Sequence, residues 1–425
     1  MPSSPSIGKE YKKYILHGWI NKKVSDICLL GRGRVISEIE IIEHSGVYPV
    51  YSSQSTNHGE MGRINTYDFD GEYVTWTTDG AYAGSVFYRQ GRFNCTNVCG
   101  TLKLKDPKYS HRFLAYLLST HTKKYVSYVG NPKLMNGVVA QIELNIPSSP
   151  DEQSKIAEIL STIDEAIEKT DQLIEKYKSI KQGLMEDFFR YGIDENGQIR
   201  SEKTHKFKDS QLGRIPLEWE VANFTRILIP QKDAIKIGPF GSQLKKEYLT
   251  ETGYRVYGQE NAFLKTFDIG ERFISKDRFK LLKSCELLPG DFIISMMGTI
   301  GKCAIIPEGI KAGIMDSHLI RIRIDESKCD KKLLFYLLEE YPLIKNQIIA
   351  LSVGGIMQGL SSRIIRSLFL PLLPKDEQSR IKTILEATDR NIETQEVNKR
   401  KLKDIKQGLM DDLLSGRVRV TKLLN

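Results

Sequence analysis

Long apolar stretches are missing from this chain of 425 residues. No hydrophobic run approaches the roughly 20 residues that a transmembrane helix needs. The first residues, MPSSPSIGKEYKK, are polar and no apolar segment follows them, so they lack the pattern of a secretory signal. Hydrophobic residues make up 40% of the chain, which is ordinary for a globular protein. We therefore expect a cytoplasmic protein without membrane association and with roughly two to three domains.

Cysteines are few, and their spacing excludes two common uses. The six cysteines are scattered, and Cys95 and Cys99 form the only close pair. No second cysteine or histidine pair lies at the spacing of a zinc site, and the pattern is not that of a disulfide scaffold. The sequence therefore predicts reduced thiols and no bound metal.

Catalytic motifs are also missing. The stretch closest to the Asn/Asp-Pro-Pro-aromatic motif of adenine methyltransferases is 106–109 (DPKY), which lacks the second proline. Residues 298–303 (GTIGKC) are too short for a phosphate-binding loop, and Cys303 stands where Ser or Thr must hold magnesium. The seven histidines include no HExxH pair. We expect no catalytic residue in this chain.

Positive charge is present in excess, and its distribution is uneven. The net charge is +9 and the pI is near 9.0. Counting Lys and Arg against Asp and Glu gives about +5 for 1–150, −5 for 151–204, +6 for 205–374 and +3 for 375–425. Two large basic blocks suit a nucleic-acid partner. The opposite signs of the two shorter segments suggest that these segments meet each other.

One segment of the chain occurs twice. Asp151–Asp187 matches Asp376–Asp412 at a constant offset without a gap, and the string IKQGLM stands in both copies, at 180–185 and 405–410. Apolar residues in the first copy recur at steps of three and four from Ile156 onward, as in a coiled-coil seam. Each copy predicts a helix of about 40 residues that would span roughly 60 Å.

The ends and middles of the two helices carry further signals. Ser149 can cap the first helix and Glu152 can close a capping box. The second copy places Thr388, Gln395 and Lys399 at seam positions, so it would pair poorly with itself. We predict that it pairs with the apolar, acidic first copy. In an antiparallel pair, each IKQGLM would lie beside the DEQS of the other helix, and its glycine suggests a close backbone approach, either between the helices or to a partner.

The two basic blocks resemble each other more weakly. Trp19 corresponds to Trp219, and 48–51 (YPVY) resembles 254–257 (YRVY). Alternating β-branched and aromatic residues, interrupted by glycine, indicate mixed α+β domains rich in strands. Their polar loops differ, since 52–58 (SSQSTNH) has no counterpart in the second block. A shared frame with different loops is typical of two binding surfaces with different targets.

Several motifs together resemble the specificity subunits of Type I restriction-modification systems. They are the Pro-x-Asp-Glu-Gln of 374–378 with its variant at 150–153, the two KQGLM strings, LLSGRVRV at 413–420, and Gly-Arg-Ile-Pro at 213–216 followed by Trp219. The likeness covers nearly the whole chain. It implies an α+β fold in which two similar globular target-recognition domains are separated by two long antiparallel coiled-coil helices with pseudo-twofold symmetry. The expected boundaries are 1–149 and 215–373 for the domains, 150–191 and 374–416 for the helices, 192–214 for a surface linker and 417–425 for a tail.

The resemblance also implies a role. Each domain would read one half of a bipartite, asymmetric site in double-stranded DNA, and the helices would set the spacer. Two methyltransferase subunits would dock on the helices and methylate adenine N6, and translocase-nuclease subunits would join for cleavage. The chain itself would hold no cofactor, because S-adenosylmethionine, ATP and magnesium belong to the partner subunits. A coiled-coil adaptor without sequence-specific DNA binding, and an enzyme with unfamiliar motifs, are the alternatives.

Residue type and loop placement select candidate DNA contacts, because Asn and Gln pair with adenine edges and Arg and Lys pair with guanine or phosphate. In the first block the candidates are Ser53, Gln54, Asn57, His58, Thr78, Tyr82, Arg89, Asn94, Asn97, Lys133 and Asn136. In the second block they are Gln243, Lys245, Lys246, Gln259, Asn261, Thr299, Ser317, His318, Gln358, Ser361 and Arg363.

A second set is expected at the interface between the helices or with partner subunits. It comprises Gln153, Ile156, Leu160, Ile180, Gly183 and Leu184 in the first helix and Gln378, Ile381, Leu385, Ile405, Gly408 and Leu409 in the second.

Overall fold

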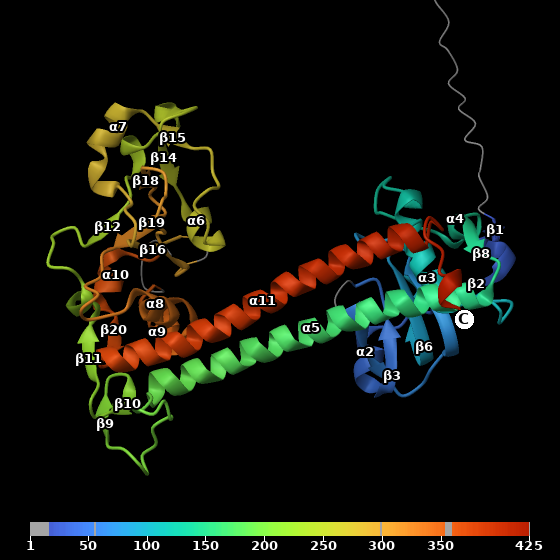
Figure 1. The fold of residues 1–425 in the computed structure, drawn as a ribbon, viewed down its shortest axis with the longest axis horizontal. Helices are drawn as coiled ribbons and strands as arrows, with labels where there is room; N and C mark the ends of the chain where they lie inside the picture. The colour runs from blue at the N-terminus through green and yellow to red at the C-terminus, as the bar shows by residue number, and fades with distance from the viewer. Residues whose placement is uncertain (1–16, 55–56, 298–299, 353–358, 425) are drawn as a thin grey trace, which may run out of the picture. The chain divides into compact units, whose positions relative to one another are not determined.

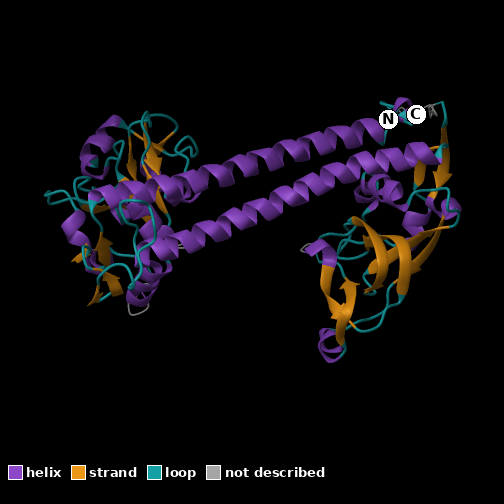
Figure 2. Ribbon diagram, turned by 60° about the horizontal axis from the view of Figure 1, so that its bottom comes forward, coloured by secondary structure: helices purple, strands orange, loops and turns teal. Residues whose placement is uncertain are grey.

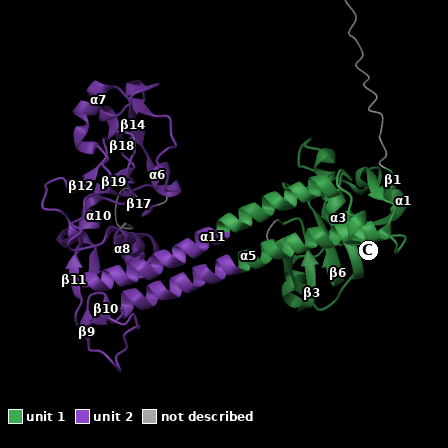
Figure 3. Cartoon of the chain, in the orientation of Figure 1, with its two compact units in different colours: residues 1–172, 396–425 green, residues 173–395 purple. Residues whose placement is uncertain are grey.

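The computed structural model describes residues 17–54, 57–297, 300–352 and 359–424. The chain divides into two units, coloured separately in Figure 3. Unit 1 comprises residues 1–172 and 396–425, and unit 2 comprises residues 173–395. No described helix is long and apolar enough to cross a membrane.

Unit 1 is built on a curled six-stranded sheet with the order β2-β7-β5-β6-β3-β4. All neighbours are antiparallel except β3 and β6. A parallel bridge joins Arg34, just after β2, to Thr96, just after β6. The strands are β2 Cys28–Arg32, β3 Ser45–Tyr51, β4 Glu60–Ile64, β5 Phe69–Thr77, β6 Val86–Cys95 and β7 Cys99–Leu104.

The remaining elements of unit 1 close its core. The antiparallel pair β1 Trp19–Lys23 and β8 Glu143–Pro147 brings the two ends of the domain together. Buried Phe113 and Leu117 on α3 pack with Trp76 of the sheet, whose Gly100 neighbour leaves room for the indole ring. The helices are α1 Val24–Ile27, α2 Glu38–Glu43, α3 His111–Ser119 and α4 Asn136–Ala140, with single turns at Asn57–Gly59 and Thr122–Tyr125.

Unit 2 holds two four-stranded sheets instead of one larger sheet. The first has the order β12-β19-β16-β17 (Ile235–Ile237, Leu319–Ile322, Phe292–Ser295, Cys303–Ile305) and is antiparallel. The second has the order β13-β15-β14-β18 (Leu249–Thr250, Phe273–Ile274, Tyr254–Tyr257, Gly313–Met315), with β14 and β18 parallel. Two-stranded pairs complete the unit: β9 Phe207–Ser210 with β10 Gly213–Pro216, and β11 Glu220–Asn223 with β20 Phe369–Leu372.

Short helices surround these sheets. They are α6 Gln259–Leu264, α7 Lys276–Leu281, α8 Lys331–Phe335, α9 Pro342–Ser352 and α10 Ser362–Ser367, with a π-helical turn at Tyr336–Glu340. The strand-rich α+β domains predicted from the sequence are confirmed in both units.

The repeated segments form the two longest described helices, α5 Pro150–Arg190 and α11 Lys375–Leu413 (Figure 1). The boundary between the units crosses both helices, so each unit contains a stretch of each. In unit 1 these stretches lie side by side with opposite direction, because Asp164 pairs with Lys406 and Asp171 pairs with Lys399 (Figure 2). Lys399, which looked unsuited to a seam, therefore supports the pairing of α11 with the acidic α5. The predicted antiparallel pairing is confirmed.

The helix ends are embedded in the cores of the units. In unit 1 the start of α5 (Ile156, Leu160) shares a core with Leu413 and Leu414 at the end of α11. In unit 2 the start of α11 (Ile381, Leu385) shares a core with the end of α5, including Met185 and Phe188. In each unit the IKQGLM string lies opposite a later stretch of the other helix, because Lys406 pairs with Asp164 and Lys181 pairs with Asp389, ten residues past each DEQS. The prediction that IKQGLM lies beside DEQS is therefore wrong. Of the apolar residues predicted at the helix interface, Ile156, Leu160, Ile381 and Leu385 are buried, and Leu184 and Leu409 are half-buried. Ile180 and Ile405 are 43% and 51% exposed, so the prediction is wrong for these two.

Candidate nucleic-acid interface

The entry of each long helix carries a buried glutamate that an arginine clamps. In unit 2, Glu377 accepts hydrogen bonds from the Arg200 guanidinium at 2.5 and 3.2 Å, from the Trp219 indole at 2.9 Å and from the Ile193 amide at 2.8 Å. Glu377 is 1% exposed. The sequence 192–214 was expected to be a surface linker, but that expectation is wrong at Ile193 and Arg200, which are buried because they complete this clamp.

Unit 1 repeats the clamp at the matching position. Glu152 is fully buried and accepts bonds from Arg419 at 2.6 and 2.7 Å. Arg419 also donates to the His17 carbonyl oxygen at 2.6 Å. In each unit a glycine in left-handed conformation, Gly192 or Gly416, stands just after the end of the other long helix. The arginine of the clamp comes later in the chain, eight residues after Gly192 and three after Gly416. Ser149 caps α5 as predicted, but Glu152 serves the clamp and not a capping box.

A buried glutamine near the start of each long helix also ties that helix to its domain. Gln153 accepts a bond from the Ser110 amide at 3.0 Å, and Gln378 accepts one from the Asp330 amide at 2.8 Å. Both glutamines are buried and donate to backbone carbonyl groups of their own unit, so they are internal to the fold.

About three turns further along each helix, an aspartate joins a tyrosine and a lysine. In unit 1, Asp164 accepts from the Tyr116 hydroxyl at 2.6 Å and pairs with Lys406 at 2.6 Å. In unit 2, Asp389 accepts from the Tyr336 hydroxyl at 2.6 Å and pairs with Lys181 at 2.7 Å. Burial and the neighbouring carboxylate raise the pKa of both tyrosines, so their hydroxyls remain donors. The lysines are the second letters of the two IKQGLM strings.

The loops of unit 1 are supported by a buried arginine. Arg89 lies with its guanidinium carbon 3.5 Å from the Tyr51 ring centroid, and it donates to the His58 carbonyl oxygen at 2.6 Å and to Thr75 Oγ1 at 3.3 Å. Burial lowers the pKa of Arg89. Asn57 and His58 have positive φ angles of 49° and 51°, so this contact holds a strained turn in place. Arg89 acts within the loop and leaves Asn57 and His58 exposed.

We expect Arg89→Met to lower the free energy of unfolding by about 1–3 kcal/mol, because the His58 carbonyl loses its charged donor. Sequence-specific DNA binding by unit 1 should weaken as well, because the turn at 57–59 loses the contact that holds it. Chemical unfolding would measure the first effect. Arg63→Met is the matched control, because the Arg63 side chain is 54% exposed and loss of its pair with Glu60 should cost about 1 kcal/mol at most. Equal stability of the two variants would contradict the role of Arg89.

Other candidates of unit 1 gather around Asp79. Arg32 pairs with Asp79 at 3.3 Å and donates to the exposed Asn97 carbonyl at 2.6 Å, while Lys133 lies 3.9 Å from the same carboxylate. Thr78 is buried and donates to Asp79 at 2.6 Å. Arg32 and Asp79 were not among the predicted residues; the stretch 31–33 (GRG) is too short to indicate a function.

The remaining candidates of unit 1 differ in exposure. Asn94 is fully buried and donates to the Thr66 carbonyl, and Asn136 donates to the Gly31 carbonyl at 3.0 Å. Gln54 donates to the Glu60 carbonyl and is half-buried like Ser53, whereas Tyr82 is 52% exposed. Direct contacts between these residues and DNA bases stay a prediction. Because Thr78, Arg89 and Asn94 are buried, they support the loops and do not face a partner.

In unit 2 the glycine-rich loop 238–246 packs against the turn after β18. A Cβ atom on Gly238 would lie 1.9 Å from the Asp316 carbonyl oxygen, so only glycine fits there. Arg278 holds the same loop through the Ser242 and Gln243 carbonyl groups and stacks over Tyr248 at 3.8 Å. The arrangement leaves the predicted residues Gln243, Lys245 and Lys246 exposed, with Ser317 and His318 half-buried in the adjoining turn.

A second set of candidates in unit 2 follows β14. Asn261 is 1% exposed and closes its own loop, accepting from the Gly258 amide and donating to the Thr266 and Ile269 carbonyls. Gln259 is half-buried. Ser361 caps α10 and Arg363 is exposed. Thr299 and Gln358 lie outside the described residues.

The glycines of the repeated strings face open space. A Cβ atom on Gly183 or Gly408 would meet no described atom within 4 Å. The expected close approach between the helices is therefore wrong for these glycines. Exposed Ile180 and Ile405 stand one turn before them, so an apolar side chain and a bare backbone share one face in both helices.

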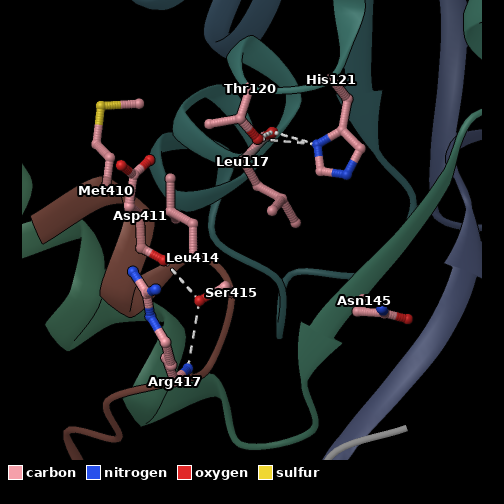
Figure 4. Close-up of a pocket in the computed structure, with 9 residues that line it drawn as sticks. All are labelled: Leu117, Thr120, His121, Asn145, Met410, Asp411, Leu414, Ser415 and Arg417. Atoms are coloured by element: carbon pink, nitrogen blue, oxygen red, sulfur yellow. Dashed lines mark hydrogen bonds between the residues drawn. The ribbon is translucent and has the colours of Figure 1, made fainter. Parts of the chain in front are cut away.

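A hollow of about 670 Å³ in unit 1 adjoins the end of α11 (Figure 4). His121 bonds to the Leu117 carbonyl at 3.0 Å, and Ser415 donates to the Asp411 carbonyl at 2.5 Å. Its polar groups thus bond largely to one another. It is lined by Leu117, Thr120, His121, Asn145, Met410, Asp411, Leu414, Ser415 and Arg417.

Comparisons with known proteins all lead to one protein family. The family model of the Type I restriction modification DNA specificity domain matches residues 17–177 and 232–404. A putative type I specificity subunit (N-terminus) of Mycoplasma pneumoniae is 55% identical over 141 residues, which are 33% of this chain and 75% of that protein. The Type I restriction enzyme MpnII specificity subunit of the same organism is 50% identical over 139 residues, which are 32% of this chain and 42% of that protein. The chain thus spans less than half of the latter relative.

A solved structure extends the likeness to the whole fold. The S subunit of a Type-I restriction-modification system from M. genitalium superposes with a TM-score of 0.60, covering 95% of this chain and 98% of that chain. The sequence identity is 16%, so the similarity concerns the fold.

Proposed function

Since the chain belongs to the Type I restriction modification DNA specificity family, we propose that it is the DNA-reading subunit of a restriction-modification complex. Unit 1 would read one half of a bipartite, asymmetric site in double-stranded DNA, and unit 2 would read the other half. The observation that carries the proposal is the repeated frame: the Glu–Arg clamp and the Tyr–Asp–Lys cluster recur in both units, while the polar loops differ.

A repeated frame with different loops suits the reading of two different sequences. Contacts to phosphate position a protein on the duplex, and contacts to base edges specify the sequence. The exposed lysines at 245 and 246 fit the first task, and the neighbouring Gln243 fits the second. The long helices α5 and α11 would fix the separation of the two half-sites.

We further propose that two copies of a methyltransferase subunit dock on the faces around Ile180–Gly183 and Ile405–Gly408. The support is the occurrence of the same exposed pair in both helices, since two equal surfaces suit two equal partners. These subunits would use S-adenosylmethionine to methylate adenine N6, and ATP- and magnesium-dependent translocase-nuclease subunits would join them. No step of that chemistry would fall to residues of this chain.

The decisive experiment is to co-express the chain with its methyltransferase and to map methylated adenines genome-wide. We expect one bipartite motif with a fixed spacer, and steep weakening of binding by salt. A complex that forms but selects no sequence from random DNA would favour a coiled-coil adaptor instead. Methylation or cleavage by the chain alone would make it an enzyme and overturn the proposal.

The docking faces allow a separate test. Gly183→Leu and Gly408→Leu should each weaken methyltransferase binding at least about tenfold, because the added side chain occupies the surface that the partner approaches. Gly183→Ala is the matched control: it should raise helix stability by about 1 kcal/mol, since nothing meets the new methyl group. Calorimetric titration with the purified methyltransferase measures the affinities, and thermal unfolding measures the stability of Gly183→Ala. Unchanged affinity of both leucine variants would place the partner elsewhere.

A further inference from the structure

A hairpin in unit 1 exposes apolar side chains that its own domain does not cover. Tyr128 is 71% exposed and Val129 is 93% exposed. They stand at the tip of the segment Ser127–Lys133, where Gly130 has a φ angle of 76°. Exposed single hydrophobic residues are common in proteins, but an adjacent aromatic and aliphatic pair at a loop tip forgoes about 1.5–3 kcal/mol of burial per side chain.

The hairpin is held firmly at its base. Ser127 and Lys133 exchange two backbone hydrogen bonds of 2.9 Å. Val126 and Leu134, on either side of them, are buried in the core of unit 1. The Trp76 indole donates to the Leu134 carbonyl at 3.0 Å. The tip is therefore presented on a fixed support, which limits the entropy lost when it binds a partner.

The surroundings of the tip join it to the predicted DNA-reading loops. The Gly80 amide donates to the Pro132 carbonyl at 3.0 Å, and the Leu134 amide donates to the Thr78 carbonyl at 2.8 Å. Lys133 lies beside Asp79, to which Arg32 is also bound. The hairpin thus continues the cluster around Asp79.

Charge indicates the kind of partner. The segment 122–134 (TKKYVSYVGNPKL) contains three lysines and no acidic residue. Lys123 and Lys124 are exposed on the turn that precedes the hairpin. A basic flank around an apolar tip matches DNA, in which phosphates border stacked bases. Proteins that bend DNA place apolar side chains between base steps from such positions.

We propose that the hairpin Ser127–Lys133 is a wedge that inserts Val129, with Tyr128 beside it, at a base step of the half-site read by unit 1. Lys123, Lys124 and Lys133 hold the flanking phosphates. The insertion unstacks that step, so the first half-site is selected partly by the ease with which it deforms. This inference rests on the proposed DNA-reading function. Of the residues in and beside the hairpin, the sequence predicts only Lys133 as a DNA contact.

The test uses the full chain assembled with its methyltransferase, and DNA carrying the motif found by methylation mapping. 2-Aminopurine is placed in turn at each adenine of the first half-site except the methylated one, because a methyltransferase itself takes its target base out of the stack. We expect the wild-type complex to raise its fluorescence several-fold at one step, and Val129→Ser to abolish that rise and weaken binding about tenfold. The slope of log affinity against log salt should stay unchanged, because no phosphate contact is lost.

Two further variants make the outcome decisive. Val47→Ser removes a valine that is 68% exposed outside the hairpin and should bind and unstack DNA like the wild type. Lys123→Ala with Lys124→Ala should reduce the salt slope by about two while leaving the fluorescence rise in place. Circular dichroism melting of Val129→Ser should match the wild type, because Val129 is 93% exposed.

Three results would overturn the wedge. If Val129→Ser binds and unstacks DNA like the wild type, the tip is only solvent-exposed. If Val129→Ser fails to assemble with the methyltransferase, the tip is a protein-docking surface. If no step of the first half-site is unstacked by the wild type, DNA is read there without deformation. A wild-type complex that marks no bipartite site would instead refute the underlying DNA-reading function.

Discussion

Replacing Arg200 by methionine should lower the free energy of unfolding of unit 2 by about 3–5 kcal/mol, because it leaves the buried Glu377 carboxylate without its charged partner. Glu377 is 1% exposed and the Arg200 side chain is 9% exposed, so water cannot replace the guanidinium without rearrangement. For a unit of this size the loss corresponds to a melting temperature lower by about 6–20 °C. Differential scanning calorimetry of the full chain would measure it.

The matched control is Arg214→Met. Arg214 pairs with Glu202, but both side chains are about half exposed, at 48% and 55%, and such pairs contribute little. The variant should melt within about 1–2 °C of the wild type. Glu377→Gln combined with Arg200→Met should be less harmful than the sum of the single changes, since the pair is removed together. Additive effects would show that the two side chains do not act as a clamp.

Gly238→Ala should abolish reading of the second half-site. The new methyl carbon would lie 1.9 Å from the Asp316 carbonyl oxygen and 2.4 Å from its carbon, and these are backbone atoms that cannot turn aside. The loop 238–246 must then move away from the 316–318 turn. We expect specific affinity to fall about 100-fold or more, because several base contacts worth about 1–3 kcal/mol each are displaced together.

The measurement is binding to DNA with one half-site scrambled at a time. Gly238→Ala should lose its discrimination at one half-site and keep it at the other. Gly137→Ala is the control, because a Cβ atom there meets nothing within 4 Å. Preserved discrimination at both half-sites would show that the loop 238–246 does not read DNA.

The two long helices could be predicted from the sequence alone. The repeated segment predicts the helices, and the start of α5 at Pro150 behind the Ser149 cap is confirmed. Period and repetition are local properties, so a sequence displays them directly. The roles of single polar residues were harder to predict. Glu152 suits a capping box by spacing, but its partner Arg419 lies 267 residues away and no local rule could select it.

The same limit explains the candidate binding residues. Arg89, Asn94 and Asn261 were selected because their side chains suit base edges, yet each is buried and bonded to backbone carbonyl groups. Residue type alone does not distinguish a side chain that reads DNA from one that shapes the loop which does so. Conversely, Val129 carries no hydrogen-bonding group, and only its exposure reveals it.

Unit 1 is made of two separate segments of the chain, and this affects how it can fold during synthesis on the ribosome. Its core combines residues near the start of the chain with Leu413, Leu414 and Val420, while unit 2 is one continuous stretch from Leu173 to Gln395. Domains generally fold as units while the chain emerges. Unit 2 can therefore reach its final structure first, whereas the earlier-made residues of unit 1 must wait for the last part of the chain. During that interval the side of the core around Ile156 and Leu160 that Leu413 and Leu414 later cover stays open, and it can bind chaperones or another nascent copy.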